Sequence, residues 1–271
     1  MTNFLSDKDY DRSKITTERR GPTLIITLCR PDKRNALDGN MMFGIRDAVD
    51  SVYTDPDVRS IVIKGEGKGF SAGVDFAALA GTGLLDATPP VARKIIRVMQ
   101  DVVNVIYDIE KPVIFAVHGF CFGMATELIL AGDFRIAQVG TKIAIQETAI
   151  GFIPDVGGTA RLTKLIGPIK AKELIMTAKI IEAEEAHSIQ LFNEVVDDAF
   201  VGAMALADTL NKNAPLAVGL AKRVINLGQP LDVRSFMDME GVAQTSLTRT
   251  EDVREGLMAK MERRDAKFTG K

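Results

Sequence analysis

The N-terminal half of the chain alternates short apolar runs of strand type with longer stretches of helical periodicity. Residues 14–29 hold two β-rich runs separated by Gly21-Pro22, a pattern that predicts a hairpin. Asp38 then precedes a periodic stretch over residues 39–54 and is placed to cap the helix that this stretch predicts. Because strands that alternate with helices favour right-handed crossovers, the pattern predicts a parallel sheet.

The pattern changes along the rest of the chain. Residues 59–64 predict a compact buried strand, and residues 91–109 predict a long amphipathic helix. Between them, residues 80–90 carry Gly and Pro at both ends and little periodicity, which predicts a surface loop that could cover a binding site. From Pro168 onward the pattern is almost wholly helical. An α/β arrangement with a helical C-terminal third is therefore expected.

One stretch, residues 111–133, combines three features that favour a functional site. The apolar run 113–117 predicts a buried strand, and glycines at 119 and 123 interrupt it before a helix that starts near Met124. Backbone N–H groups at such a start are unpaired and can bind developing negative charge. Glu127 lies among apolar residues, where a carboxylate is costly to bury unless it is paired or used; a solvated Glu on an amphipathic helix is the alternative.

Composition limits the classes of function. The chain has 271 residues, of which 46% are hydrophobic and 26% charged, with a net charge of −2, so it can form one large domain or a domain plus an appendage. The charge argues against general nucleic-acid binding, and no apolar run reaches membrane-span length. The polar, acidic N-terminal stretch lacks the pattern of a leader, so a cytoplasmic protein is expected. With two cysteines and two histidines, neither a disulfide framework nor a metal site is expected.

Two glycine-rich segments carry further candidates. Residues 65–76 hold four glycines between a strand and an apolar segment, where the backbone could approach a ligand closely, although the segment fits neither a P-loop nor a dinucleotide fingerprint. Residues 146–162 place Glu147 and Asp155 near Gly157-Gly158 and a helix start. Carboxylates in this setting suit proton transfer next to a carbonyl, and a solvated loop is the alternative for each of them.

Five segments, in this order, resemble the motifs of one family, the crotonase or enoyl-CoA hydratase/isomerase superfamily. They are RPDKRNAL (30–37), GFSAGVDF (69–76), AVHGFCFGMATEL (116–128), IGFIPDVGGTARL (150–162) and EAEEAHSIQLFNEVV (182–196). The resemblance runs over nearly the whole chain. Three positions depart from the usual pattern: His118 stands where Asn is commoner, Met124 where Gly is frequent, and Gln190 where Gly is usual.

The resemblance implies an α/β fold, a crotonase-like repeated ββα superhelix with a helical C-terminal trimerisation region. On this basis residues 1–200 are expected to form the core with the coenzyme A thioester site, and residues 201–271 a helical region for oligomerisation and active-site cover. It also implies an acyl-CoA thioester substrate, no separate cofactor, and a homo-trimer or homo-hexamer.

The same resemblance assigns roles to individual residues. The backbone N–H groups of Val74 and Met124 would form an oxyanion hole for the thioester enolate. Glu127 and Glu147 match the family's two catalytic glutamates, which in hydratases hold a water between them. One carboxylate helps to deprotonate that water and the other delivers a proton to the α-carbon, so retention of both favours hydration of a 2-enoyl-CoA to a 3-hydroxyacyl-CoA.

Asp155 leaves alternatives open. An aspartate at the matching position moves protons in dienoyl-CoA isomerases of the family, so a double-bond isomerase of 3-enoyl- or 3,5-dienoyl-CoA is the second candidate. An aspartate there also occurs in a thioester-hydrolase branch, and some members of the fold only bind. The structural alternative is that Asp155 caps the helix that comes after it.

The resemblance also suggests residues that contact the substrate. These candidates for substrate or coenzyme A binding are Lys68, Ala72, Gly73, Asp75, Gly123, Arg263 and Phe268. For Lys68, Arg263 and Phe268, a solvated surface position is the alternative. Leu84, Leu85 and Met99 are candidates to line the acyl pocket.

Overall fold

A computed structural model describes residues 11–271. Most of the polar N-terminal stretch, in which no leader is expected, lies outside the described residues. The large sheet has six strands in the order β1-β2-β3-β4-β6-β9, and a small sheet has the order β5-β7-β8. The strands of the large sheet are β1 (Ile15–Arg20), β2 (Thr23–Leu28), β3 (Ser60–Gly65), β4 (Val113–Val117), β6 (Phe134–Gln138) and β9 (Glu194–Val196). Those of the small sheet are β5 (Phe120–Phe122), β7 (Lys142–Ala144) and β8 (Ile181–Glu182).

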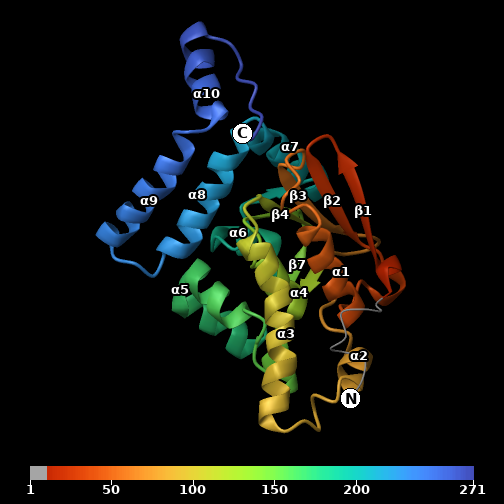
Figure 1. The fold of residues 1–271 in the computed structure, drawn as a ribbon. Coiled ribbons are helices and arrows are strands. Elements are labelled where there is room, and N and C mark those ends of the chain that lie inside the picture. The colour runs from red at the N-terminus through yellow and green to blue at the C-terminus, as the bar shows by residue number, and fades with distance from the viewer. Residues whose placement is uncertain (1–10) are drawn as a thin grey trace.

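Helices cover both faces of the large sheet and form the C-terminal region (Figure 1). The α-helices are α1 (Gly39–Asp50), α2 (Phe76–Gly81), α3 (Pro89–Asp108), α4 (Met124–Ile129), α5 (Gly158–Thr177), α6 (Ala183–Ser188), α7 (Ala199–Asn211), α8 (Pro215–Gly228), α9 (Val233–Leu247) and α10 (Glu251–Glu262). Three short 3-10 helices are η1 (Arg12–Lys14), η2 (Pro31–Lys33) and η3 (Glu147–Ile150).

The predicted hairpin and the predicted parallel sheet are both confirmed. Strands β1 and β2 pair antiparallel around Gly21-Pro22, and β2, β3, β4, β6 and β9 then pair in parallel. Asp38 caps α1 as expected, because its side chain accepts a hydrogen bond from Met41 N–H. The strands of a parallel sheet end at one edge, so the loops after β3 and β4 lie side by side.

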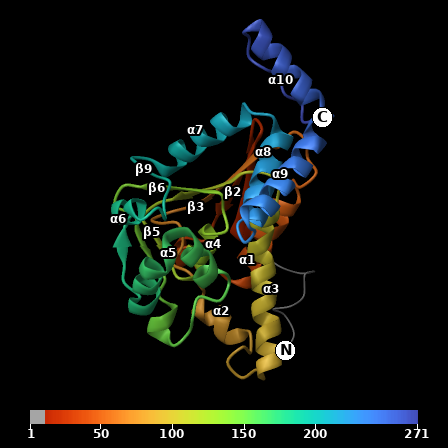
Figure 2. The same ribbon diagram turned by 90° about the vertical axis from the view of Figure 1, so that its left-hand side faces the viewer.

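Alternate residues of the central strands enter two different apolar cores. Ile26, Ile63 and Phe115 pack with α1, α3 and α4, whereas neighbours in the same strands, such as Val62 and Ile114, pack under α7. This arises from the two-residue period of a strand. Figure 2 shows α7 along one face of the sheet with α1 and α3 on the other. Helix α7 approaches closely because its buried stripe is made of alanines (Ala199, Ala203 and Ala207).

Two consecutive units have the ββα order that the resemblance implies. In β4-β5-α4 and β6-β7-α5 the first strand joins the large sheet and the second joins the small sheet. The segment after β3 takes the same course, since Ser71 forms a parallel bridge with Cys121 of β5. This second layer places the glycine-rich segment beside the turn that leads into α4.

The surface loop expected over residues 80–90 is shorter in the structure. Helix α2 ends at Gly81 and α3 begins at Pro89, two residues before the predicted start. Pro89 and Pro90 occupy the first turn of α3, where a missing N–H costs no hydrogen bond, so the proline pair begins the helix instead of preceding it.

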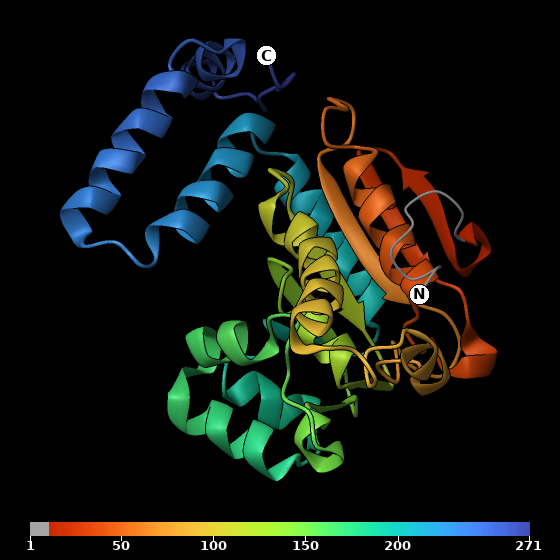
Figure 3. The ribbon, with the colours of Figure 1, turned by 60° about the horizontal axis from the view of Figure 1, so that its bottom comes forward.

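The C-terminal helices project from the core. Helix α8 packs beside α9, none of whose residues is buried, and α10 continues outward (Figures 1 and 3). Helix α7 lies on the sheet, so the projecting part begins with α8; the expected division at residue 200 stays a prediction. Within residues 11–271, no helix has both the length and the apolar character needed to cross a bilayer.

Candidate active site

A buried asparagine organises the glycine-rich segment after β3. The side-chain amide of Asn35 donates to the carbonyl oxygens of Glu66, Gly69 and Phe70 at 2.8, 3.1 and 3.1 Å, and its Oδ1 accepts from Arg30 N–H. Asn35 is fully buried and has a φ of 52°, in the left-handed region. Sequence reasoning missed this residue, although its place in RPDKRNAL was a usable signal.

The segments after β3 and β4 are brought into direct contact. Phe122 N–H donates to Ser71 C=O, and a Cβ at Gly73 would lie 2.5 Å from the carbonyl oxygen of Phe122 and 3.5 Å from Met124 N. Only glycine fits at this approach, where φ is 91°. Among the described residues, no acceptor is found for the N–H groups of Val74 or Met124, so both donors remain available in the cavity that these residues line.

Glu127 is buried, and two backbone groups hold it. It is 1% exposed, and its Oε2 accepts from Val156 N–H at 2.9 Å and from Gly158 N–H at 2.8 Å. Burial, and after it the charge of Glu147, raises the pKa of Glu127 to about 8, although the two N–H groups act in the opposite direction. The solvated-helix alternative for Glu127 is therefore wrong.

Glu147 begins η3 and faces the same cavity. A Cβ at Gly123 would lie 2.9 Å from its Oε1, so glycine at 123 leaves the space that this carboxylate needs. Its Oε2 is buried and has no hydrogen-bond partner among the described residues. Burial raises the pKa of Glu147, and the charge of Asp155 acts in the same direction. A buried, unpaired carboxylate oxygen is an unusual cost, which functional sites can carry.

Asp155 is half-buried and lines the cavity with the two glutamates. Burial raises the pKa of this carboxyl. It does not cap α5: the helix starts after Gly157 without a side-chain cap, and Glu127 instead accepts the N–H of Gly158, the first residue of α5. The cap alternative for Asp155 is therefore wrong.

The cavity between α1, α2, α3, η3 and the start of α5 has a volume of about 100 Å³. Its remaining wall is mainly aliphatic, with Phe152 as its aromatic residue, and no Lys or Arg among residues 11–271 lines it. The apolar lining residues are Leu37, Met42, Val74, Ala78, Leu79, Leu84, Ile95, Ile96, Met99, Met124, Ile150, Phe152, Ile153 and Val156. Leu84 and Met99 thus lie where the acyl-pocket prediction put them, whereas Leu85 is 65% exposed and is not part of the wall.

Asp75 lies at the cavity with its carboxylate already engaged. It accepts from the N–H groups of Ala77 and Ala78 at the start of α2, and its Oδ2 pairs with Arg30 at 2.6 Å. It therefore orients α2 and the loop before it. Ala72 N–H donates to Arg34 C=O and Gly123 N–H to Ala144 C=O, so their backbones hold the two donor segments in place.

Three further candidates do not line the cavity. Lys68 is exposed in the loop after β3. Arg263 ends α10, and Phe268 lies in the tail that folds back along that helix, close to Gly256. Figure 1 shows α10 at the far end of the molecule from α2, so within one chain neither residue reaches the cavity. Their roles in coenzyme A binding remain predictions.

Comparison with known proteins agrees with this geometry. A sequence model of the enoyl-CoA hydratase/isomerase family matches residues 18–271. The chain is 36% identical to the crotonyl-CoA hydratase of Syntrophomonas wolfei over 260 residues, which cover 95% of this chain and 98% of that protein. It is also 36% identical over 262 residues to the carnitinyl-CoA dehydratase of Salmonella agona, covering 93% and 97% of the two chains.

Solved structures show the same fold. The enoyl-CoA hydratase of Bacillus anthracis superposes with a TM-score of 0.89 at 31% identity, covering 96% of this chain and 100% of that one. The family match includes every residue that lines the cavity.

Proposed function

The chain belongs to the enoyl-CoA hydratase/isomerase family, and we propose that it hydrates a short 2-enoyl-CoA to a 3-hydroxyacyl-CoA. The observation that carries the proposal is the pair Glu127 and Glu147 in one cavity, both with raised pKa values. Two close carboxyl groups that resist ionising together can hold one proton between them near neutral pH. Hydration needs such a pair, one ionised and one protonated.

The proposed reaction moves one water molecule onto the double bond. The ionised carboxylate takes a proton from water, whose oxygen bonds to the β-carbon as the π electrons move toward the thioester carbonyl. The protonated carboxyl then gives its proton to the α-carbon as the enolate collapses. The pair again holds one proton at the end, so the reaction as proposed requires no cofactor, and coenzyme A takes part only as a portion of the substrate.

The enolate oxygen is proposed to accept hydrogen bonds from the N–H groups of Val74 and Met124. Both donors lack an acceptor among the described residues, and the close approach of Gly73 to Met124 supports their working together. Donors that are fixed before the reaction stabilise the developing charge, and loss of one such donor typically costs about 3–4 kcal/mol.

The cavity wall favours an uncharged acyl group. The wall is largely apolar, so an aliphatic acyl chain can pack against it. Within the described part of the chain no Lys or Arg lines the wall, so a carboxylate at the end of an acyl chain would have no cationic partner there. We therefore propose an uncharged acyl group, and a short one by analogy with the crotonyl group named for the Syntrophomonas wolfei relative.

Asp155 favours one second candidate function. Its carboxyl lies in the cavity and does not cap α5, so it is free to move a proton. With Glu147 it could shift the double bonds of a 3-enoyl- or 3,5-dienoyl-CoA.

A homo-trimer or homo-hexamer is proposed because the projecting helices leave apolar side chains uncovered. Val233, Met237 and Val242 of α9 and Leu257 and Met261 of α10 are each more than half exposed. Apolar surface of this kind on an arm without a core of its own favours contact with a second copy. The same contact would be the route by which Arg263 and Phe268 of one copy approach the site of another. A cytoplasmic location stays a prediction.

Absorbance measurements with purified protein test both functions. Crotonyl-CoA should lose its conjugated-enoyl absorbance as it is hydrated, and a 3,5-dienoyl-CoA should give no 2,4-dienoyl signal. The reverse result would support the isomerase. A C4 to C10 series of 2-enoyl-CoAs tests the acyl group, because kcat/KM should fall as the chain outgrows the cavity.

A further inference from the structure

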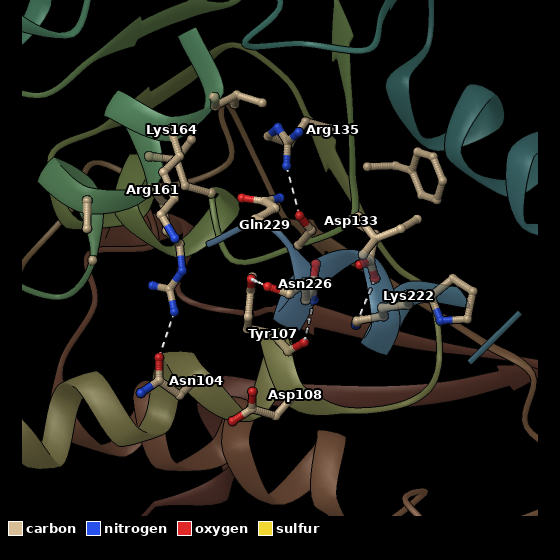
Figure 4. Close-up of a pocket in the computed structure, with 18 of the residues that line it drawn as sticks. Asn104, Tyr107, Asp108, Asp133, Arg135, Arg161, Lys164, Lys222, Asn226 and Gln229 are labelled. Carbon is tan, nitrogen blue, oxygen red and sulfur yellow. Dashed lines mark hydrogen bonds and ion pairs between the residues drawn. The ribbon is translucent and has the colours of Figure 1, made fainter. Parts of the chain in front are cut away.

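A second, larger cavity lies behind the wall that carries the carboxylates. It has a volume of about 940 Å³ and lies between α3, α5 and α8 (Figure 4). Val156 lines both cavities, and Gly157 lines the larger one. Residues 155–158 are therefore a thin partition, with Glu127 on one side and the polar side chains of the larger cavity on the other.

On the side of the larger cavity, two side chains hold this partition by its carbonyl groups. Gln100 of α3 donates to Asp155 C=O at 2.7 Å, and Arg161 Nη1 donates to Val156 C=O at 3.2 Å. The guanidinium also lies in the space that a Cβ of residue 157 would occupy, and the φ of 111° at Gly157 favours glycine there.

Arg161 is itself held in place. Its Nη2 donates to Asn104 Oδ1 at 2.6 Å, and its guanidinium lies 5.4 Å from the ring centre of Tyr107. Figure 4 shows the side chain reaching from α5 to Asn104 on α3. A guanidinium with a hydrogen-bonded partner and an aromatic neighbour loses little further freedom when it binds a carbonyl.

On the active-site side, the same backbone donates to the proposed catalytic group. Val156 N–H and Gly158 N–H both bind Glu127 Oε2. Val156 thus donates to Glu127 through its N–H and accepts from Arg161 through its C=O. A shift of this one residue changes both contacts.

We propose that Arg161 is a positioning residue that fixes Glu127 through the backbone of residues 156–158, anchored by Asn104. The inference rests on the proposed function, because Glu127 matters only if it takes part in the reaction. Arg161 also attracts the Glu127 carboxylate electrostatically. The other charged groups that face Glu127 are Glu147 and Asp155, and both favour its protonated form.

The larger cavity also contains a residue that can serve as a matched control for Arg161. Lys164 lines the same cavity one helical turn further along α5, is exposed, and forms no hydrogen bond or ion pair with the described residues. Arg161→Met and Lys164→Met each remove one positive charge from the cavity, but only the first removes the contacts with the partition. A general effect of cavity charge would appear in both variants.

The first measurement does not depend on turnover. Carbon-13 NMR of protein labelled at glutamate carboxyls tracks the titration of Glu127, assigned by comparison with Glu127→Gln. In Arg161→Met the Glu127 pKa should rise, since a cation is lost and the two N–H donors loosen, whereas Lys164→Met should match the wild type. An unchanged Glu127 titration in Arg161→Met, or an equal shift in Lys164→Met, overturns the proposal.

The second measurement is steady-state kinetics with the thioester that the wild type hydrates. Arg161→Met should lower kcat about 10²-fold with little change in KM, because a small misplacement of a reacting group has an effect of that size. Asn104→Leu, which keeps Arg161 but removes its anchor, should lower kcat less. Guanidinium ion added to Arg161→Ala should restore part of kcat. The proposal is overturned if Arg161→Met changes only KM. It is also overturned if guanidinium does not rescue Arg161→Ala and Asn104→Leu keeps the wild-type kcat.

These two readouts separate the inference from the proposed function. If the wild type turns over no enoyl-CoA, the function fails while the NMR titration still tests the coupling of Arg161 to Glu127. If Arg161→Met does not fold, Asn104→Leu supplies the same titration test.

Discussion

Gly158 lies directly against the side chain of Glu127. Its N–H donates to Glu127 Oε2 at 2.8 Å, and a Cβ built on it would lie 2.6 Å from Glu127 Cγ. The first residue of α5 therefore both binds the carboxylate and leaves room for it. One backbone position thus couples the start of a helix to the geometry of the proposed catalytic pair.

Gly158→Ala should displace Glu127 and lower kcat about 10²-fold, because the new methyl group would overlap the carboxylate at its present position. The matched control is Gly241→Ala in α9, where a Cβ meets no atom within 4 Å. Steady-state rates of both variants test this. Near-normal kcat in Gly158→Ala would contradict the role given to that contact.

Glu147→Gln and Glu127→Gln should each lower hydration about 10²–10⁴-fold, since an amide cannot carry the transferred proton. Folding and oligomer size should be unchanged, because the amide nearly preserves the shape of the side chain. Rates, circular dichroism and size-exclusion chromatography provide the check. A variant that keeps near-normal turnover removes that glutamate from the mechanism.

Asp155→Asn distinguishes the two candidate reactions. It should spare hydration, which needs only the glutamate pair, and should severely reduce any dienoyl-CoA isomerisation. Both rates are to be measured on the same preparation. Equal losses in the two reactions would indicate that Asp155 supports the site without moving a proton.

Hydration should decline above pH 8. The Glu127 pKa is raised to about 8 by burial and by the charge of Glu147, so at higher pH the pair loses the proton that the α-carbon needs. A pH profile of kcat that stays level to pH 10 would contradict a shared proton. The profile should be recorded with a substrate whose binding does not change over this range.

Folding stability should depend on pH in the same region. The carboxyl of Glu127 titrates near 4.5 when exposed and at about 8 in the folded chain, so the folded state binds the proton more tightly. Its contribution to the free energy of unfolding is complete below pH 4.5 and is lost as pH rises toward 8. Across this pH range, urea unfolding should show a smaller loss of unfolding free energy for Glu127→Gln than for the wild type.

Lys222→Met should lower the free energy of unfolding by about 3–5 kcal/mol, because it leaves the largely buried Asp133 carboxylate without the cation that contacts it. Lys222 Nζ lies 2.8 Å from Asp133 Oδ2 and also donates to the carbonyl groups of Ile106 and Lys111, which joins α8 to the core. The double variant Lys222→Met/Asp133→Asn should recover part of the loss. Urea unfolding measures both, and equal stability of the single variant and the wild type would contradict this role.

Several elements were predictable because their signals are local. Gly21-Pro22 indicated the hairpin, Asp38 indicated the start of α1, and apolar runs indicated the strands of the parallel sheet. Turn chemistry, capping and periodicity act between residues close in sequence, so one chain is enough to recognise them. The proline pair at the start of α3 resembles a loop in sequence, because its helical use depends on the residues after it.

The order of amino acids is enough to identify the candidate chemistry: two glutamates and an aspartate, each beside a glycine-rich segment, in an order that resembles one family. The arrangement of those groups becomes visible in the folded chain. The fold showed that Glu127, not Asp155, binds the start of α5, and that Asn35 holds the glycine-rich segment. It also brought Arg161 against the backbone that binds Glu127. Burial and hydrogen bonding between distant segments arise only when the chain folds, so no local pattern records them.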